Sequence, residues 1–221
     1  MRRFRCVSHE TPHGTGQSFM RPEDVLSRER RERLLEFVDL LARWRAITNL
    51  ISDRDFKNVW ERHIEDSINL QRLFPAKRRW LDIGAGAGFP GIVIGVLLAD
   101  FDGAVVHCIE SDSRKCAFLR AAVDTLQIPV RVHNVRAESL SVADMRPIDV
   151  VTARAFASVA KILALAETLL SDGAVVALPR GRSSSRDIED IDERRYTCSV
   201  TLNPRDQGGN FLTIEKRARN V

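Results

Sequence analysis

The residues best suited to chemistry in this 221-residue chain form one glycine-rich stretch. It reads Asp82-Ile83-Gly84-Ala85-Gly86-Ala87-Gly88-Phe89-Pro90-Gly91. Glycines let backbone N–H groups come close to a ligand, and a proline in the first turn favours the start of a helix, whose N-terminus attracts negative charge. The stretch therefore predicts a nucleotide-type pocket at the end of a buried parallel strand.

Two classes of nucleotide site fit this turn incompletely. A phosphate loop for ATP or GTP would need Gly-Lys-Ser/Thr at its end, which Phe89-Pro90-Gly91 does not supply. A nicotinamide dinucleotide site fits the pattern Gly86-x-Gly88-x-x-Gly91 literally, and Glu110 lies where the ribose acid is expected. If Gly86, Gly88 and Gly91 are the glycines of a dinucleotide site, Asp82 before the turn has no role. A nicotinamide-dependent oxidoreductase is therefore kept as the alternative.

A third interpretation uses Asp82, Gly84, Gly86 and Gly88 together. The pattern Asp-x-Gly-x-Gly-x-Gly resembles the cofactor turn of class I S-adenosylmethionine-dependent methyltransferases. In those enzymes an acid at the end of the first strand helps to hold the aminoacyl end of the cofactor, directly or through water. A carboxylate suits a ligand with an ammonium and a sulfonium and suits a pyrophosphate badly, so we favour this interpretation.

Composition narrows the class of protein further. The chain is 44% hydrophobic, has a formal net charge of +4, and is compatible with a polyanionic partner or simply with a basic enzyme. Its four cysteines show neither a C-x-x-C pair nor a zinc spacing, which indicates reduced thiols and no metal site. No apolar run reaches membrane-spanning length. We expect a cytoplasmic protein, with a monomer as the default.

Periodicity divides the chain into three parts. Residues 1–21 are polar and aperiodic and are expected to form a flexible extension. Residues 22–75 should form a helical cap that begins near Pro22, and the charged run Arg28–Arg33 should be a solvated face with i,i+4 ion pairs. Residues 76–221 alternate between strand and helix patterns and should form the main domain.

The predicted main domain is an α/β fold of the class I S-adenosylmethionine-dependent methyltransferase type, with a Rossmann-like seven-stranded sheet. The strands are expected at 80–83, 104–110, 130–134, 149–153, 174–178, 197–202 and 211–215. Helices are expected at 90–99, 113–126 and 158–170. The last two strands flank a short turn and predict an antiparallel hairpin, whereas a dinucleotide domain would end in a sixth parallel strand.

Several residues lie at the carboxyl ends of these strands, where such sheets bind ligands. Glu110 could accept both ribose hydroxyls, and the backbone of Ala137-Glu138 could border the adenine. Arg154 is framed by alanines, which indicates either a ligand contact or a buried ion pair. Phe156 could stack on a base or simply pack.

Motifs that this sequence lacks also restrict the reaction. After the fourth predicted strand the chain has Arg154-Ala155-Phe156 and lacks the Pro-Pro-aromatic turn of exocyclic-amine methyltransferases. No cysteine lies in the Pro-Cys context that the nucleophile of cytosine-C5 methyltransferases requires. Methyl transfer to an atom with a free lone pair, such as guanine N7, needs alignment and exclusion of water and no covalent catalyst. The absence of an obvious base or nucleophile fits that chemistry.

Taken together, five segments resemble the ribosomal small subunit methyltransferase G family, also called glucose-inhibited division protein B. They are Asn49-Leu50, Arg62–Ser67, Leu81–Gly91, Glu110-Ser111 with Lys115 and Phe118-Leu119, and Arg154–Ser158. The resemblance covers about residues 30–216. The family commonly has Lys-Gly after the fifth strand, whereas this chain has Pro179-Arg180-Gly181, so a lysine-specific role is in doubt there.

This resemblance implies transfer of a methyl group from S-adenosylmethionine to N7 of a guanine in the 530 loop of 16S rRNA (guanine 527 in the usual rRNA numbering), on rRNA or a small-subunit particle. It implies cofactor contacts at Gly84, Phe89, Ala137, Glu138 and Arg154, with Glu110 on the ribose. It also places His63, Asp66 and Arg154 near the pocket mouth where the guanine enters. Candidate phosphate contacts are Arg180, Arg182, Lys115 and Arg120. A non-catalytic rRNA-binding assembly factor of the same fold is a further alternative.

Overall fold

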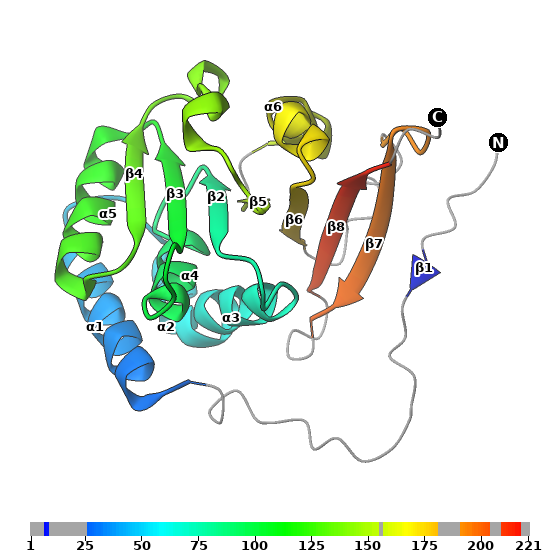
Figure 1. The fold of residues 1–221 in the computed structure, drawn as a ribbon. Coiled ribbons are helices and arrows are strands. Elements are labelled where there is room, and N and C mark those ends of the chain that lie inside the picture. The colour runs from blue at the N-terminus through cyan, green and yellow to red at the C-terminus, as the bar shows by residue number, and fades with distance from the viewer. Residues whose placement is uncertain (1–6, 9–25, 155–156, 181–190, 204–208, 218–221) are drawn as a thin grey trace, which may run out of the picture.

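The computed structural model describes residues 7–8, 26–154, 157–180, 191–203 and 209–217. Its centre is one sheet with the strand order β1-β7-β8-β6-β5-β2-β3-β4 (Figure 1). The strands are β1 (Val7–Ser8), β2 (Arg79–Ile83), β3 (Val105–Glu110), β4 (Val130–Asn134), β5 (Val150–Ala153), β6 (Val175–Arg180), β7 (Tyr196–Leu202) and β8 (Asn210–Lys216).

The direction of the strands confirms the predicted class of fold. Strands β2 to β6 run parallel to their neighbours, and β8 is antiparallel to both β6 and β7. The predicted seven strands and the closing hairpin are therefore present. The two residues Val7–Ser8 add an eighth strand, which pairs in parallel with β7. This pairing was not predicted, because two residues carry no periodicity; the rest of residues 1–21 lies outside the described part.

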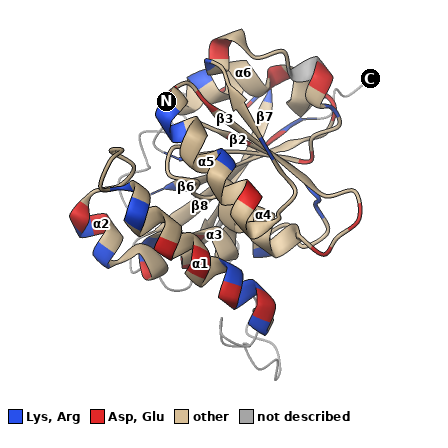
Figure 2. Ribbon diagram, turned by 90° about the vertical axis from the view of Figure 1, so that its left-hand side faces the viewer, with Lys and Arg blue, Asp and Glu red and all other residues tan. Residues whose placement is uncertain are grey.

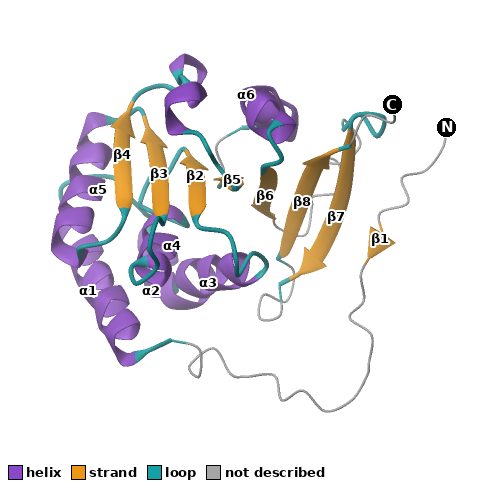
Figure 3. Ribbon diagram, viewed as in Figure 1, coloured by secondary structure: helices purple, strands orange, loops and turns teal. Residues whose placement is uncertain are grey.

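Helices cover both faces of the sheet (Figure 3). They are α1 (Arg28–Trp44), α2 (Asp53–Lys57), α3 (Glu65–Arg72), α4 (Gly91–Leu98), α5 (Ser113–Leu126) and α6 (Val159–Ser171), with a π-helical turn at Trp60–Ile64 and 3₁₀ turns at Ala137–Ser139 and Val142–Met145. Along β2 the side chains alternate between the two faces: Trp80 packs with α1, α3, α4 and α5, and Leu81 packs with α6.

Helix α4 is the innermost helix. All eight of its residues are buried, as expected for a helix whose sequence, Gly-Ile-Val-Ile-Gly-Val-Leu-Leu, is apolar on every side. It contacts β2, β3 and β4 on one side and α1, α3 and α5 on the other. The loop that precedes α4 is therefore anchored to an element with little freedom to move.

The helical cap differs in detail from the prediction. The side chain of Ser27 accepts a hydrogen bond from the backbone N–H of Arg30, so α1 begins at Arg28 and not near Pro22, which lies outside the described residues. The charged run at the start of α1 is only in part the solvated face that was predicted: Arg28 pairs with Glu32 across one turn, whereas Arg30 and Arg33 are half-buried and pair with Asp100. Residues of both charges follow one another along α1 (Figure 2).

The second part of the cap, which carries Phe56, Trp60, Ile64 and Ile68, is not one continuous α-helix. Helix α2 ends where the side chain of Asn58 donates to the carbonyl of Arg54, and a π-helical turn precedes α3. Hydrogen bonds of this local kind compete with the helix ladder. Among the described residues no helix is both long and apolar enough to cross a bilayer.

Candidate active site

The turn after β2 has the backbone that its glycines predict. Gly84, Gly86 and Gly88 all have positive φ, and at Gly88 (φ 89°) a Cβ would lie 2.6 Å from Cγ1 of Ile92. Gly91 has an ordinary φ, but a Cβ there would lie 2.5 Å from Sγ of Cys108. Two different constraints, backbone conformation and close packing, therefore require glycine here.

Asp82 lies beneath this turn. Its side chain is fully buried, and Oδ2 accepts a 2.9 Å hydrogen bond from the backbone N–H of Gly91 at the start of α4. Burial raises the pKa of the Asp82 carboxyl to about 7. Its Oδ1 is buried without a hydrogen-bond partner among the described residues. The geometry makes Asp82 an anchor of the turn.

Glu110, at the carboxyl end of β3, holds the other side of the turn. Its Oε2 accepts from the backbone N–H of Gly86 at 3.0 Å, and its Oε1 accepts from the N–H of Asp112 at 2.9 Å. These two bonds fix the carboxylate before any ligand arrives and leave further lone pairs on its oxygens. A carboxylate oriented in this way suits a pair of hydroxyl groups.

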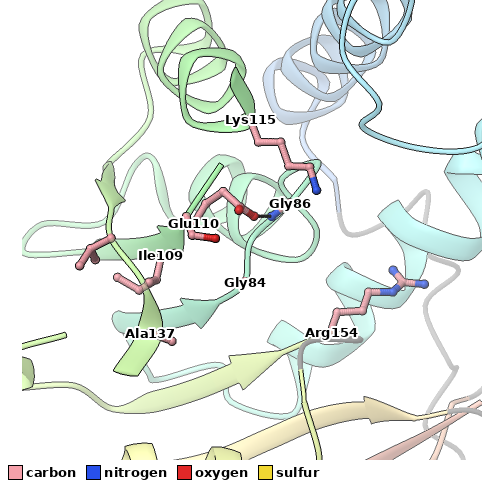
Figure 4. A pocket seen from close by; sticks show the side chains of 9 residues that line it. Gly84, Gly86, Ile109, Glu110, Lys115, Ala137 and Arg154 are labelled. Carbon is pink, nitrogen blue, oxygen red and sulfur yellow. Dashed lines mark hydrogen bonds between the residues drawn. The ribbon is translucent and has the colours of Figure 1, made fainter. Parts of the chain in front are cut away.

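A cavity of about 310 Å³ opens at the carboxyl ends of β2, β3 and β5 (Figure 4). Its lining contains five of the predicted site residues, Gly84, Gly86, Glu110, Ala137 and Arg154. In Figure 4 the Glu110 carboxylate points toward Gly86, and the Arg154 side chain extends from the end of β5 away from Glu110. The structure thus brings these five residues together as expected for the carboxyl edge of a parallel sheet.

Four other predicted cofactor residues do not line this cavity: Asp82, Gly88, Phe89 and Glu138. Asp82 and Gly88 form the turn from below. Phe89 is buried, and its ring stacks on that of His63 at 4.9 Å between centroids. The Glu138 side chain pairs with Lys161 of α6 instead. Strand-end position alone could not distinguish side chains that face the cavity from those that support it.

The three residues predicted at the pocket mouth lie on adjacent elements. Arg154 donates to the carbonyl of Arg62 in the π-helical turn at 2.9 Å, and its Nη2 lies 3.6 Å from Oδ2 of Asp66 in α3. His63 also belongs to the π-helical turn. Its ring nitrogens are buried without hydrogen-bond partners among the described residues, and burial lowers the pKa of the imidazole to about 4. His63 is therefore neutral near pH 7.

Four lining residues were not predicted as cofactor contacts: Ile109, Ser111, Lys115 and Val135. Ser111 and Val135 each follow the last residue of a strand, so their position was a usable signal. Lys115 had been expected at a phosphate, and the structure places it in the cavity wall. Arg120 is exposed on α5 and Arg180 ends β6. Arg182 and Phe156 lie outside the described residues.

With this geometry established, sequence comparison identifies the family. Residues 30–205 match the family described as rRNA small subunit methyltransferase G. The ribosomal RNA small subunit methyltransferase G of Brucella ovis is 44% identical over 178 residues, which cover 80% of this chain and 82% of that protein. The protein of the same name from Brucella abortus strain S19 matches equally well.

The chain belongs to the rRNA small subunit methyltransferase G family. The resemblance inferred from the sequence motifs is thereby confirmed, as is the prediction of a methyltransferase. The five quoted segments all fall within residues 30–205, which match the family. The family match does not extend to residues 1–29, which include the whole of the predicted polar extension.

Solved structures confirm the fold of this family member. A variant of MtNAS determined with S-adenosylmethionine aligns with a TM-score of 0.54 at 16% identity, over 86% of this chain and 76% of that one. A precorrin-6y C5,15-methyltransferase from Geobacter metallireducens aligns with a TM-score of 0.51 at 14% identity, over 76% and 90% of the two chains. At this identity the comparison concerns the fold alone. Within the described ranges, no group of three or more His, Cys, Asp or Glu side chains could hold a metal ion.

Proposed function

We propose that this protein transfers a methyl group from S-adenosylmethionine to N7 of guanine 527 in the 530 loop of 16S rRNA. The observation that carries the proposal is a cavity with two unlike walls in a chain of this family. One wall is the glycine turn held by Glu110, and the other is Arg154 fixed by Asp66. The Glu110 wall suits the nucleoside part of the cofactor, and the Arg154 wall suits the guanine base.

The cavity fits the cofactor in three respects. Gly84 and Gly86 have no Cβ and line it with backbone, and Glu110 presents an oriented carboxylate that can accept the two ribose hydroxyls. The buried Oδ1 of Asp82 has an open lone pair below the turn, which a water molecule could connect to an ammonium group. When bound, S-adenosylmethionine supplies a methyl group activated by the sulfonium charge.

The residues at the mouth fit a guanine nucleophile. Guanine N7 has a free lone pair, so the protein needs to align it and exclude water, and needs no base. Arg154 offers guanidinium donors that suit the neighbouring O6 of guanine. His63 is neutral because its pKa lies near 4, so it does not present a proton that would compete for N7.

The RNA partner is supported by charge. Lys115 lies in the cavity wall and Arg120 is exposed on α5, so both can contact phosphates, and the chain has a formal net charge of +4. Binding by such contacts should weaken as salt increases. We further propose that the protein acts as a monomer in the cytoplasm, on rRNA or on a small-subunit particle.

One experiment tests the proposal directly. Purified protein is incubated with S-adenosylmethionine labelled in the methyl group and with either 16S rRNA or small-subunit particles, and N7-methylguanine is mapped by site-specific chain cleavage. The expected product is a single modified guanine in the 530 loop, which is absent from rRNA of cells that lack the protein. Modification elsewhere, or of another atom, would contradict the proposal.

Two alternatives give different outcomes with the same protein. A nicotinamide-dependent oxidoreductase would bind NAD in preference to S-adenosylhomocysteine when both are titrated by calorimetry. A non-catalytic assembly factor would bind rRNA normally but incorporate no methyl group. The family match and the antiparallel strand β8 beside β6 favour the methyltransferase.

A further inference from the structure

Asn203, at the end of β7, is distant in sequence from the other site residues but is joined to them by hydrogen bonds. Its side chain is 6% exposed, and its Nδ2 donates to Oδ1 of Asp66 in α3 at 2.6 Å. Its Oδ1 accepts from Nδ2 of Asn69, one turn further along α3, at 3.0 Å. An amide can do both because it is a donor and an acceptor at once.

These bonds form one continuous series that ends at the cavity. Nη1 of Arg72 donates to Oδ1 of Asn69, Asn69 donates to Asn203, and Asn203 donates to Asp66. The other carboxylate oxygen of Asp66 faces Nη2 of Arg154. The hairpin of β7 and β8 is thereby connected to the guanidinium that lines the cavity.

Asn69 and Asn203 are buried, so the hydrogen bonds of this series contribute to the free energy of folding. Hydrogen bonds to a charged group inside a protein are stronger than those between neutral groups, and a buried partner left without its bond loses free energy. Asn203 is itself fixed, because its backbone N–H donates to the carbonyl of Gly209 across the base of the β7–β8 connection. It therefore holds one oxygen of Asp66 in place and orients the other toward Arg154.

We propose that Asn203 is a positioning residue for methyl transfer, which keeps the Asp66 carboxylate directed at Arg154 and so keeps Arg154 in place for the guanine. This rests on the proposed function, since that function assigns Arg154 to the guanine side of the cavity. Asn203 does not line the cavity, so its effect passes through Asp66.

The test uses Asn203→Asp, which keeps the size of the side chain but replaces the donor that faces Asp66 by a carboxylate. The expected result is a fall in kcat on rRNA of about 10–100-fold, the range typical of lost supporting contacts. The dissociation constant for S-adenosylhomocysteine should stay within about twofold, because the Glu110 wall does not touch this series. Gln127→Glu, at the far end of α5, is the matched control for an added negative charge and should leave both quantities unchanged.

A double variant separates positioning from general packing. Combining Asn203→Asp with Asp66→Asn exchanges the two groups, so that a hydrogen bond can form again between positions 66 and 203 while the charge moves away from Arg154. The thermal midpoint should recover toward that of the parent, and kcat should not. Recovery of kcat together with stability would show a packing role only and would overturn the proposal.

Asn203→Ala keeps the test decisive if the acidic variant fails to fold. It removes the donor without adding charge and should lower kcat by at least about tenfold at unchanged cofactor affinity. Folded variants with parental kcat, or with cofactor affinity reduced as much as kcat, would overturn the positioning role. A parent protein that transfers no methyl group would instead overturn the proposed function, and this role with it.

Discussion

The two walls of the cavity are built in different ways. The Glu110 wall is made by backbone: a glycine turn, the end of β3 and two N–H donors that hold one carboxylate. The wall with Arg154 is made mainly by side chains from α3 and from the residues that follow β5 and β7, together with the Arg62 carbonyl of the π-helical turn. The first wall comes from a short stretch and its neighbouring strand, whereas the second exists only when the helical cap and the closing hairpin have packed on the sheet.

This difference implies that one wall serves cofactor binding and the other serves the substrate. A wall of backbone groups is rigid and accepts any ligand of the right shape and charge, so it suits a cofactor that many related folds share. A wall of interlocked side chains can be exact for one substrate and can be altered by single substitutions. Variants on the two sides should therefore separate cofactor binding from methyl transfer.

The largest effect is expected at the Arg154 wall. Arg154→Ala removes a cation from the cavity and leaves the Asp66 carboxylate without it, so methyl transfer should fall by about 100–1,000-fold. S-adenosylhomocysteine affinity should change much less. Filter binding of labelled methyl groups measures the first quantity and calorimetry the second. Arg154→Lys, which retains the charge but not the planar donors, should recover part of the activity. A fully active alanine variant would remove Arg154 from the site.

The Glu110 wall should show the opposite separation. Glu110→Ala removes the acceptor for the ribose and frees the Gly86 and Asp112 N–H groups, so the dissociation constant for S-adenosylhomocysteine should rise by about 10–100-fold. At saturating cofactor, kcat should approach the parental value, because the Arg154 wall is intact. An equal loss in both variants would show that the two walls do not act separately.

The contribution of Asp82, below the turn, to the free energy of unfolding should depend on pH. The unfolded carboxyl titrates near pH 4 and the folded one at about 7. The folded state therefore binds the proton more tightly, and the stability contributed by this group is full in acid and falls as pH rises from about 4 to 7. Asp82→Asn cannot titrate, so its free energy of unfolding relative to the parent should rise by about 3 kcal/mol across that window.

Urea denaturation at a series of pH values checks this, and a constant difference between the two proteins would contradict it. His63 and His107, whose pKa values burial lowers to about 4, act in the other direction in both proteins and cancel in the difference. Asp82→Ala should both weaken cofactor binding and destabilise the protein, because it leaves the Gly91 N–H without its acceptor.

The smallest effect is expected at Glu138. Its side chain pairs with Lys161 outside the cavity, at an exposed site. Such ion pairs contribute little. Glu138→Gln should change S-adenosylhomocysteine affinity by less than about twofold in the same titration. A larger loss would show that the Glu138 side chain contributes to cofactor binding.

The sequence predicted the sheet and the Glu110 wall because both depend on local pattern. The alternation of apolar strands and helices gives the parallel order, and the spacing of Asp82, Gly84 and Gly86 gives the turn. It singled out Arg154 by its place among alanines at a strand end, but it predicted Asp66 only through the family resemblance, since no periodicity indicates that an arginine after β5 meets an aspartate in α3.

The remaining differences have physical causes that a linear reading does not reveal. Asp82 and Phe89 were expected at the ligand, but in the structure the first bonds to the start of α4 and the second stacks on His63. Which side of a turn a side chain occupies depends on what packs beneath it. Asn203 was not singled out at all, because its partners lie more than a hundred positions earlier in the chain.

The strands β7 and β4, at opposite sides of the sheet, have different neighbours, and this matters for solubility. β7 is paired along part of its length by Val7–Ser8, whereas β4 has β3 as its only partner within the described part of the chain. A bare edge invites another molecule to add a strand. β4 is only five residues long and carries Arg131 and His133 between its valines and its end. Short edge strands that carry a positive charge are protected against the addition of a strand from another molecule. The β4 edge should therefore resist self-association even when the protein is concentrated.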